Sequence, residues 1–491
     1  MSKLYVFGIG GTGSRVLKSL TMLLAAGVKI NADEIVPIVI DPDHAAADLT
    51  RTIKLMQDYN KIYNRIDHNN YNRNAFFGTK INLEIIPSVR MPLQNTENTD
   101  FKTYIGLPLM TDENGKHNAN YALATMLFSE KNLDATMEVG FKGNPNIGSV
   151  VLNQFALSDE FKHFAASVNQ DDRIFIISSI FGGTGASGFP LLLKNLRAIS
   201  DTQSGCENVK NATIGAVSVL PYFDVAPDNN PDEMRRSEID SATFISKTKA
   251  ALSYYEKNIT EANALYYIAD NISKQYKNSE GGTTQQNDAH FIELAAALAV
   301  VDFASLTGLS TQNGQPQNIV YKEFGIKQEA KEIAFGDLDS KTNSTIKKPL
   351  AAFTLFCKYL NEQILNSYKD QPWAKDHKFD DNFLRSPFFQ SELGDLKKSY
   401  LEWLREMNDN VRAFAPFDLR EKKGDVFSLI KGETPAKIGN FRYILTSNYA
   451  LFDAYLNSKQ GKIKTDSTPE QIFVELFYNA IERLVKSKFR M

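Results

Sequence analysis

The stretch LYVFGIGGTGS at residues 4–14 decides the fold that this sequence predicts. A short apolar run stops at Gly8, three more glycines follow by residue 13, and an amphipathic helical pattern then runs from Arg15 to Ala26. Glycines in such a turn let the backbone approach a phosphate without a Cβ in the way, and the next helix directs free N–H groups toward it. The alternative is an ordinary strand-to-helix turn with incidental glycines. The motif does not select one nucleotide, and it lacks the Gly-Lys-Ser/Thr ending of a P-loop.

Buried strands recur along the first 310 residues. Residues 35–40 are too apolar for a half-exposed strand and are typical of a strand covered on both faces of a parallel sheet. Similar runs occupy residues 173–178, 213–220 and 265–268. Strand, helix and strand in this order form a βαβ unit, whose crossover is right-handed in nearly all proteins. The sequence therefore predicts an α/β fold with a Rossmann-like parallel sheet.

The pattern changes after about residue 308, where glycine clusters end and long helical patterns dominate. We predict a nucleotide-binding domain at residues 1–310, with a central buried helix at residues 291–306, and a mostly helical C-terminal domain at residues 311–491. Residues 48–131 are rich in Asn, Asp, Lys and Tyr, and we expect exposed helices and loops inserted between strands there.

Two further glycine-containing segments extend the phosphate-binding pattern. The segment FGGTGASG at residues 181–188 follows the strand at 174–178 and precedes a helical pattern, so two strands of one predicted sheet end in such loops. Two loops around one polyphosphate are a more specific requirement than the single loop of a dinucleotide fold. The segment GFKGNPNIG at residues 140–148, taken alone, predicts only a surface turn.

Composition excludes several classes of protein. The chain has 491 residues and a net charge of −3, so bulk charge predicts no nucleic-acid partner. Cys206 and Cys357 stand in no metal or redox spacing, and none of the six histidines pairs with another at metal-ligand spacing, so we predict no metal site formed by the protein alone. No apolar run approaches the ~20 residues of a membrane-spanning helix. No signal peptide precedes the first strand, and we expect a cytoplasmic protein.

These segments, in this order, resemble the tubulin/FtsZ superfamily, and especially its divergent bacterial tubulin-like members with helical C-terminal parts. The resemblance covers roughly residues 1–310, and it implies binding of GTP or GDP with Mg²⁺. Its most specific parts are the two glycine loops, although the second is one residue longer here than in most members. The remaining matches are residues 35–43 to the second strand and its acidic loop, 143–148 to the Gly-Asn-Pro-x-x-Gly loop of FtsZ, 213–223 to the strand ending in Pro-Phe, and 264–271 to the strand ending at the Asn that reads guanine.

The resemblance also implies roles for individual residues. Asn144 would lie near the γ-phosphate or its Mg²⁺, and Asp41 near metal-bound water or the ribose. Asn271 would hydrogen-bond the base and Phe291 would stack on it, with Asn287 and Glu293 as nearby candidates for the purine edge. From the residues alone, Phe291 could equally be core packing, Asn287 a helix N-cap and Asp41 a strand-end turn residue. The residues implied to contact the phosphates are Gly10, Gly11, Thr12, Gly13, Gly182, Gly183, Thr184 and Gly185.

Hydrolysis in this family needs a second subunit, whose acidic Asn-x-Asp-x-x-Asp loop enters the nucleotide site and polarises water. Asp302 matches the first acid of that loop, but Ser305 stands where the second is expected. The resemblance therefore implies Asp302 as the catalytic candidate and a slow GTPase, because the loss of one catalytic carboxylate costs orders of magnitude in rate. It also implies head-to-tail self-association into cytoskeletal-type filaments, and we expect the C-terminal helices to bind a protein partner.

Three alternatives stay open. Adenylyltransferases of the ubiquitin-activating type also begin with a Gly-x-Gly-Gly-x-Gly-Ser loop and use ATP, but they need a catalytic cysteine and do not account for residues 172–190. An NAD-dependent dehydrogenase could use Asp41 to bind the ribose. A nucleotide-regulated scaffold that does not polymerise would bind its partner through the C-terminal helices.

Overall fold

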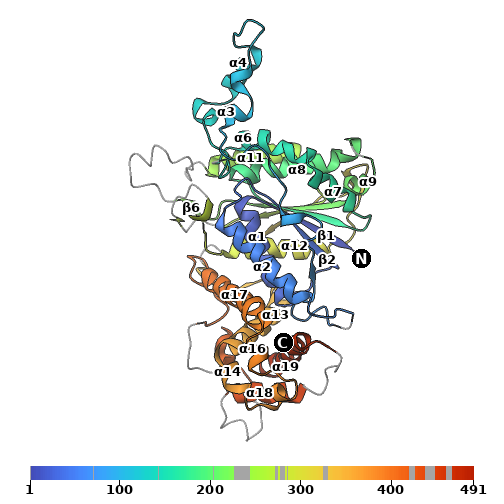
Figure 1. The fold of residues 1–491 in the computed structure, drawn as a ribbon, viewed down its shortest axis with the longest axis vertical. Coiled ribbons are helices and arrows are strands. Elements are labelled where there is room, and N and C mark those ends of the chain that lie inside the picture. The colour runs from blue at the N-terminus through green and yellow to red at the C-terminus, as the bar shows by residue number, and fades with distance from the viewer. Residues whose placement is uncertain are drawn as a thin grey trace.

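The computed structural model has three parts along its longest axis: an extended arm at one end, a central sheet with helices on both faces, and a group of helices at the other end (Figure 1). No helix within the described residues is long and apolar enough to cross a membrane. The described residues are 2–69, 71–141, 143–202, 204–225, 244–270, 275–276, 282–284, 286–324, 330–419, 426–436, 448–459 and 467–491.

The sheet has seven strands in the order β11-β7-β5-β4-β1-β2-β3, and every neighbouring pair is parallel. The predicted α/β fold with a parallel sheet is therefore confirmed. The strands are β1 (Lys3–Ile9), β2 (Glu34–Ile40), β3 (Lys80–Ile81), β4 (Arg173–Ser179), β5 (Thr213–Val219), β7 (Ala264–Ile268) and β11 (Val320–Phe324).

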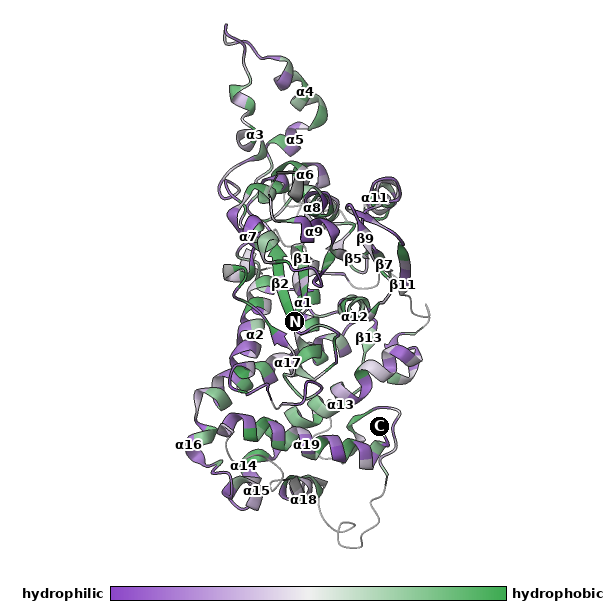
Figure 2. Cartoon of the chain, turned by 90° about the vertical axis from the view of Figure 1, so that its right-hand side faces the viewer, coloured by the Kyte–Doolittle hydropathy of each residue, from purple (hydrophilic) through white to green (hydrophobic). Residues whose placement is uncertain are grey.

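Both faces of the sheet are buried, because successive strand residues point to opposite sides. Val6 packs into one hydrophobic core and its neighbour Phe7 into the other. The largely hydrophobic colour of β2 in the middle of the molecule is consistent with this double burial (Figure 2). Helices α1 (Gly10–Ala25), α2 (Ala47–Tyr63) and α12 (Phe291–Ser305) cover the first face, and α6 (Pro145–Leu152), α7 (Asp159–Ser167), α8 (Gly183–Thr202) and α11 (Phe244–Asn258) cover the second.

The strand order has a topological switch point between β1 and β4. The chain leaves β1 for β2 on one side and later continues from β4 to β5 on the other, so the order reverses between β1 and β4. Helix α1 follows β1 on one face, and α8 follows β4 on the opposite face. Open α/β sheets bind ligands at such a switch point, outside the carboxyl ends of the strands.

The central helix α12 is buried on nearly all sides, as the sequence predicts, with residues such as Ile292, Ala296 and Val300 fully enclosed. It packs between the sheet and the C-terminal helices, and one hydrophobic core continues from α1 and α12 into the helical part. The main C-terminal helices are α13 (Ser340–Glu362), α17 (Leu393–Asn408), α18 (Asn448–Lys459) and α19 (Pro469–Phe489).

Two features of the fold differ from the sequence interpretation in detail. Strand β11 pairs with β7, so the sheet includes residues 320–324 beyond the expected boundary at residue 310, and the division into two domains stays a prediction. Within residues 48–131, helix α2 is half buried on the sheet side of the molecule, and β3 forms one edge of the seven-stranded sheet. Helices α3 (Phe101–Tyr104), α4 (Ala119–Leu127) and α5 (Glu130–Leu133) form the projecting arm (Figure 1).

Candidate phosphate-binding site

The two main glycine loops lie side by side at the switch point. Strand β1 pairs with β4, with Gly8 opposite Ile177, so the loops that follow both strands leave the same edge of the sheet. Gly10 has a left-handed backbone (φ +69°), and a Cβ placed on it would lie 3.5 Å from the Cβ of Thr184. The segments around Gly11 and Gly183, 172 positions apart in the sequence, are thus in direct proximity.

Some glycines are required by the turns themselves. A Cβ on Gly13 would lie 2.4 Å from the carbonyl carbon of Gly8, and one on Gly185 would lie 2.5 Å from the carbonyl oxygen of Ser179. Backbone atoms cannot yield at these distances, so no larger residue fits. Gly11 differs, because a Cβ there would meet no backbone atom and only the end of the Arg15 side chain, at 3.4 Å. Its lack of a side chain leaves space above the loop.

The third segment, which the sequence alone suggests is a surface turn, packs against the second loop. A Cβ on Gly183 would lie 2.9 Å from the backbone nitrogen of Asn144, and one on Gly148 would lie 2.2 Å from Ser187 Oγ. Helix α6 begins directly after Asn144, whose side-chain amide donates to Asn132 Oδ1 at 2.7 Å. The carbonyl of Gly143 accepts a hydrogen bond from Lys247 at 3.1 Å.

Three helices therefore begin close together at the switch point. The first turns of α1, α8 and α6 contain no acidic residue, and no side chain among the described residues caps the start of α1 or α6. The first N–H groups of a helix have no partner within the helix, and its positive dipole end favours an anion. Three such ends, brought together by close glycine contacts, form a site suited to a polyphosphate.

Two aspartates lie beside the switch point, at the end of β2. Ile40 pairs with Ile9, which places Asp41 next to Gly10. Burial raises the pKa of Asp41 to about 7, with the nearby charge of Asp43 acting in the same direction and a hydrogen bond from the Asp43 backbone N–H opposing it. Asp43 is also buried and accepts hydrogen bonds from the backbone N–H groups of Ala45 and Gly282.

A magnesium ion at this site would need phosphate oxygens as ligands in addition to carboxylates of the protein. The described residues contain no cluster of three or more His, Cys, Asp or Glu side chains that could hold a metal alone. Mg²⁺ bound to nucleotides usually takes one or two carboxylates, the phosphate oxygens and water. Asp41 and Asp43, which follow β2, could supply these one or two carboxylate ligands.

The residues expected at the base have other contacts. The ring of Phe291 is buried and lies 5.3 Å from that of Phe414, as the packing interpretation expects. Asn287 is half-buried, and its backbone N–H donates to Asp48 at 3.3 Å. Its alternative interpretation as an N-cap is wrong, because His290 caps α12 by accepting from the N–H of Ile292 at 3.0 Å. Asn271 lies outside the described residues.

A buried ion network, absent from the sequence interpretation, joins the first loop to α12. The Arg15 guanidinium donates to Glu293 at 2.5 Å, Asp48 at 3.1 Å and the hydroxyl of Tyr222 at 2.8 Å, and it also reaches Thr12 at 3.4 Å. Burial alone would lower the pKa of Arg15, but Tyr222 and the two acids outweigh it and raise that pKa well above its usual value.

Glu293 is fully engaged in this network. One carboxylate oxygen accepts from Arg15 and Tyr222, and the other accepts from the backbone N–H of His290 at 3.1 Å. Its side chain is therefore not free to read a purine edge. The signal in the sequence is Glu293, a charged residue within the otherwise apolar pattern of residues 291–301.

The same network reaches the C-terminal helices through Glu406 of α17. This carboxylate accepts from Lys18 of α1 at 3.0 Å, from Arg51 of α2 at 3.2 Å, and from the backbone N–H of Ala289 at 2.9 Å. One acidic side chain thus touches the helix of the first glycine loop and the segment that precedes α12.

Asp302 lies near the opposite end of α12 from the loops. Eleven residues separate it from Phe291, which corresponds to roughly 16 Å along the helix axis. Burial alone would raise the pKa of Asp302, but hydrogen bonds from Lys322, Lys341 and Tyr266 outweigh it and lower that pKa. Within one chain, the structure does not bring Asp302 to the glycine loops.

Comparisons with known proteins give little further information. No protein-family description matches the chain, and no curated protein matches it. Among solved structures, CetZ from Methanosaeta thermophila strain DSM 6194 is similar at 14 % sequence identity with a TM-score of 0.23. The match covers 55 % of this chain and 46 % of that one, so the chain spans less than half of its length. A likeness this weak carries no argument about function.

Proposed function

We propose that this protein binds a guanine nucleotide, GTP or GDP, with its phosphates at the switch point between β1 and β4. The observation that supports this most is the convergence of three helix starts and three glycine-containing loops at the switch point of a parallel sheet. Free N–H groups from separate segments can surround a chain of phosphates, whereas a single loop suffices for a dinucleotide.

In this proposal the backbone of the two main loops holds the phosphates. Residues 10–13 bind the diphosphate, and residues 182–185 surround the β- and γ-phosphates. Asn144, at the start of α6 and against Gly183, lies near the γ-phosphate. Asp41 and Asp43 supply carboxylate oxygens for Mg²⁺. The preference for guanine rests on the resemblance of residues 264–271 to the strand that ends at a base-reading Asn.

The adenylyltransferase alternative has less support. Such an enzyme needs a reactive thiolate, which requires an exposed or electropositive setting. Cys206 and Cys357 are both only 1 % exposed, and burial raises the pKa of each thiol. A dinucleotide-binding enzyme would leave the second loop and α6 without a role.

We further propose slow hydrolysis that depends on a neighbouring subunit in a head-to-tail filament. Asp302 and the glycine loops lie toward opposite ends of α12, so a copy stacked end to end could present Asp302 to the next copy's phosphates. Contacts of this heterologous kind generate open polymers when they do not close. The two lysines that hold Asp302 and the Ser305 in place of a second acid are both consistent with slow turnover.

Isothermal titration calorimetry tests the binding proposal. GTP and GDP should bind the full chain, and ATP and NAD should bind at least tenfold more weakly. Gly11→Asp should weaken GTP binding by about tenfold or more, because it adds a negative charge to the first phosphate loop while no backbone atom of the turn blocks a side chain there. Gly336→Asp is the matched control, since a Cβ there meets nothing within 4 Å. Equal affinity in both variants, or preference for ATP or NAD, would reject the proposal.

A further inference from the structure

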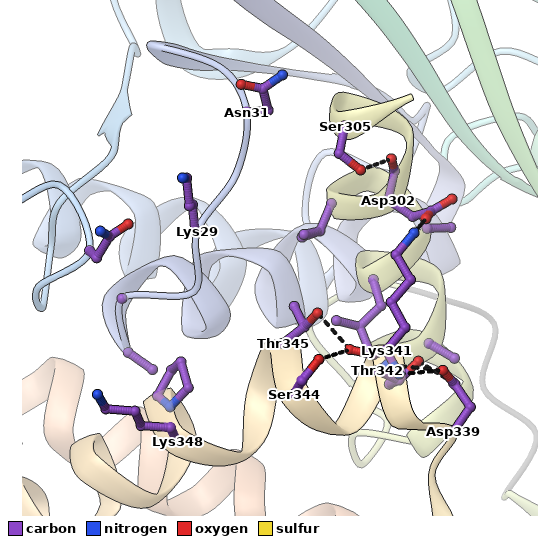
Figure 3. A pocket seen from close by; sticks show the side chains of 18 of the residues that line it. Lys29, Asn31, Asp302, Ser305, Asp339, Lys341, Thr342, Ser344, Thr345 and Lys348 are labelled. Carbon is purple, nitrogen blue, oxygen red and sulfur yellow. Dashed lines mark hydrogen bonds and ion pairs between the residues drawn. The ribbon is translucent and has the colours of Figure 1, made fainter. Parts of the chain in front are cut away.

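A cavity of about 890 Å³ lies between the sheet and the C-terminal helices, near the end of α12 that is far from the glycine loops (Figure 3). Its walls come from the turn after α1, strands β7 and β11, one side of α12, the first half of α13 and part of α19. Small-molecule sites in proteins have volumes of roughly 300–1,000 Å³ and are often formed where two units meet.

One wall of the cavity is formed by one side of α12. Ala295, Leu298, Ala299 and Asp302 all line the cavity, and their spacing of three and four residues places them on the same side of the helix. The two alanines leave room where larger side chains would fill the space. Apolar atoms of α13, including Ala352, continue this surface. The cavity can therefore hold an apolar body of several carbon atoms.

Most charged groups of the lining already have partners. Lys322 and Lys341 both bind Asp302, which also accepts from Tyr266 at 2.7 Å. Lys348 pairs with Glu482 at 3.0 Å.

Two further acidic residues of the lining, Asp339 and Glu323, do not offer a free carboxylate to the cavity. Asp339 caps α13 by accepting from the backbone N–H groups of Lys341 and Thr342. Lys322 and Glu323 are neighbours in β11, and strand alternation turns their side chains to opposite faces. Because Lys322 reaches α12, the carboxylate of Glu323 points away from it.

Lys29 is the exception. Its side chain is exposed on the wall opposite Asp302 and Ser305, near Asn31 (Figure 3). Among the described residues, no acidic side chain lies within ion-pairing distance of its ammonium group. The cavity thus combines an apolar surface on α12 with one uncompensated positive charge at its rim.

We propose that this cavity binds a small organic anion with an apolar body, whose anionic group pairs with Lys29 and whose body packs on the Ala295–Ala299 face of α12. The ligand would contact both the sheet unit and α13, so its binding would hold the two units together. This site is separate from the glycine loops and does not depend on nucleotide binding.

Fluorescence titration of the full chain with two probes tests this assignment. The anionic probe is 8-anilinonaphthalene-1-sulfonate, and the neutral probe is N-phenyl-1-naphthylamine. Lys29→Glu should weaken binding of the anionic probe about three- to tenfold and leave the neutral probe unchanged, because it reverses one partly solvated charge. Ala299→Phe should weaken both probes at least tenfold by filling the cavity.

Matched controls lie on the exposed side of α11, on the other face of the sheet, where Lys249→Glu and Ala250→Phe should change neither affinity. Lys29 is exposed, so the Lys29→Glu variant should fold. This variant alone can therefore decide the test if Ala299→Phe destabilises the chain. The proposal is overturned if the anionic probe does not bind the wild-type chain, if Lys29→Glu binds it with unchanged affinity, or if a folded Ala299→Phe variant binds both probes normally.

Discussion

Removal of the Glu293 carboxylate should destabilise the protein strongly, because it leaves a buried guanidinium without its closest partner. Arg15 is only 5 % exposed and Glu293 only 1 %, and the two groups are 2.5 Å apart. Loss of one member of a buried ion pair typically costs about 3–5 kcal/mol. Asp48 would still contact Arg15 at 3.1 Å, so we expect Glu293→Ala to cost about 3 kcal/mol, at the lower end of this range.

Urea denaturation followed by circular dichroism measures this change in the free energy of unfolding. Glu402→Ala, on the exposed side of α17, is the control and should cost no more than about 0.5 kcal/mol. A double-mutant cycle with Arg15→Met should give a coupling energy of about 1–3 kcal/mol, because removal of both charges leaves neither unpaired. A Glu293→Ala variant as stable as the control would refute the network as a source of stability.

Three other outcomes are expected. Burial raises the pKa of Asp41 to about 7, so the folded state favours the neutral form of this carboxyl group. The free energy of unfolding should therefore fall by up to about 4 kcal/mol between pH 4 and a pH above 7. A pH series of urea titrations measures this decrease, and Asp41→Asn should remove it. Gly185→Ala should lower the melting temperature by several degrees, whereas Gly336→Ala should not, since only the first Cβ would meet backbone atoms. Asp302→Asn should abolish GTP turnover in a phosphate-release assay without changing GTP affinity; turnover at the wild-type rate would remove Asp302 from the mechanism.

The sequence was sufficient for the parts of the fold that depend on local pattern. Continuous apolar runs predicted strands buried on both faces, and glycine clusters after two of them marked the edge of the sheet where the candidate site lies. That the turn at residues 140–148 packs against the second loop could not be predicted from its own residues. Its position depends on α6 lying on α8, a contact between segments far apart in sequence.

The ion network around Arg15 was missed for a related reason. Arg15 and Glu293 are 278 positions apart, and only the packing of α1 on α12 brings them together. A charged residue in an apolar helical pattern indicates that a buried partner exists, but it does not identify that partner. The same contact explains why Glu293, a candidate for the purine edge, is engaged elsewhere.

Hydrogen exchange measured by mass spectrometry, with and without GDP and Mg²⁺, tests most directly whether three separated segments hold one phosphate chain. We predict that peptides covering residues 8–14, 140–148 and 181–188 become protected together, over one range of nucleotide concentration, while α18 and α19 stay unchanged. Protection of one of these loops alone, or protection confined to other parts of the chain, would contradict the account.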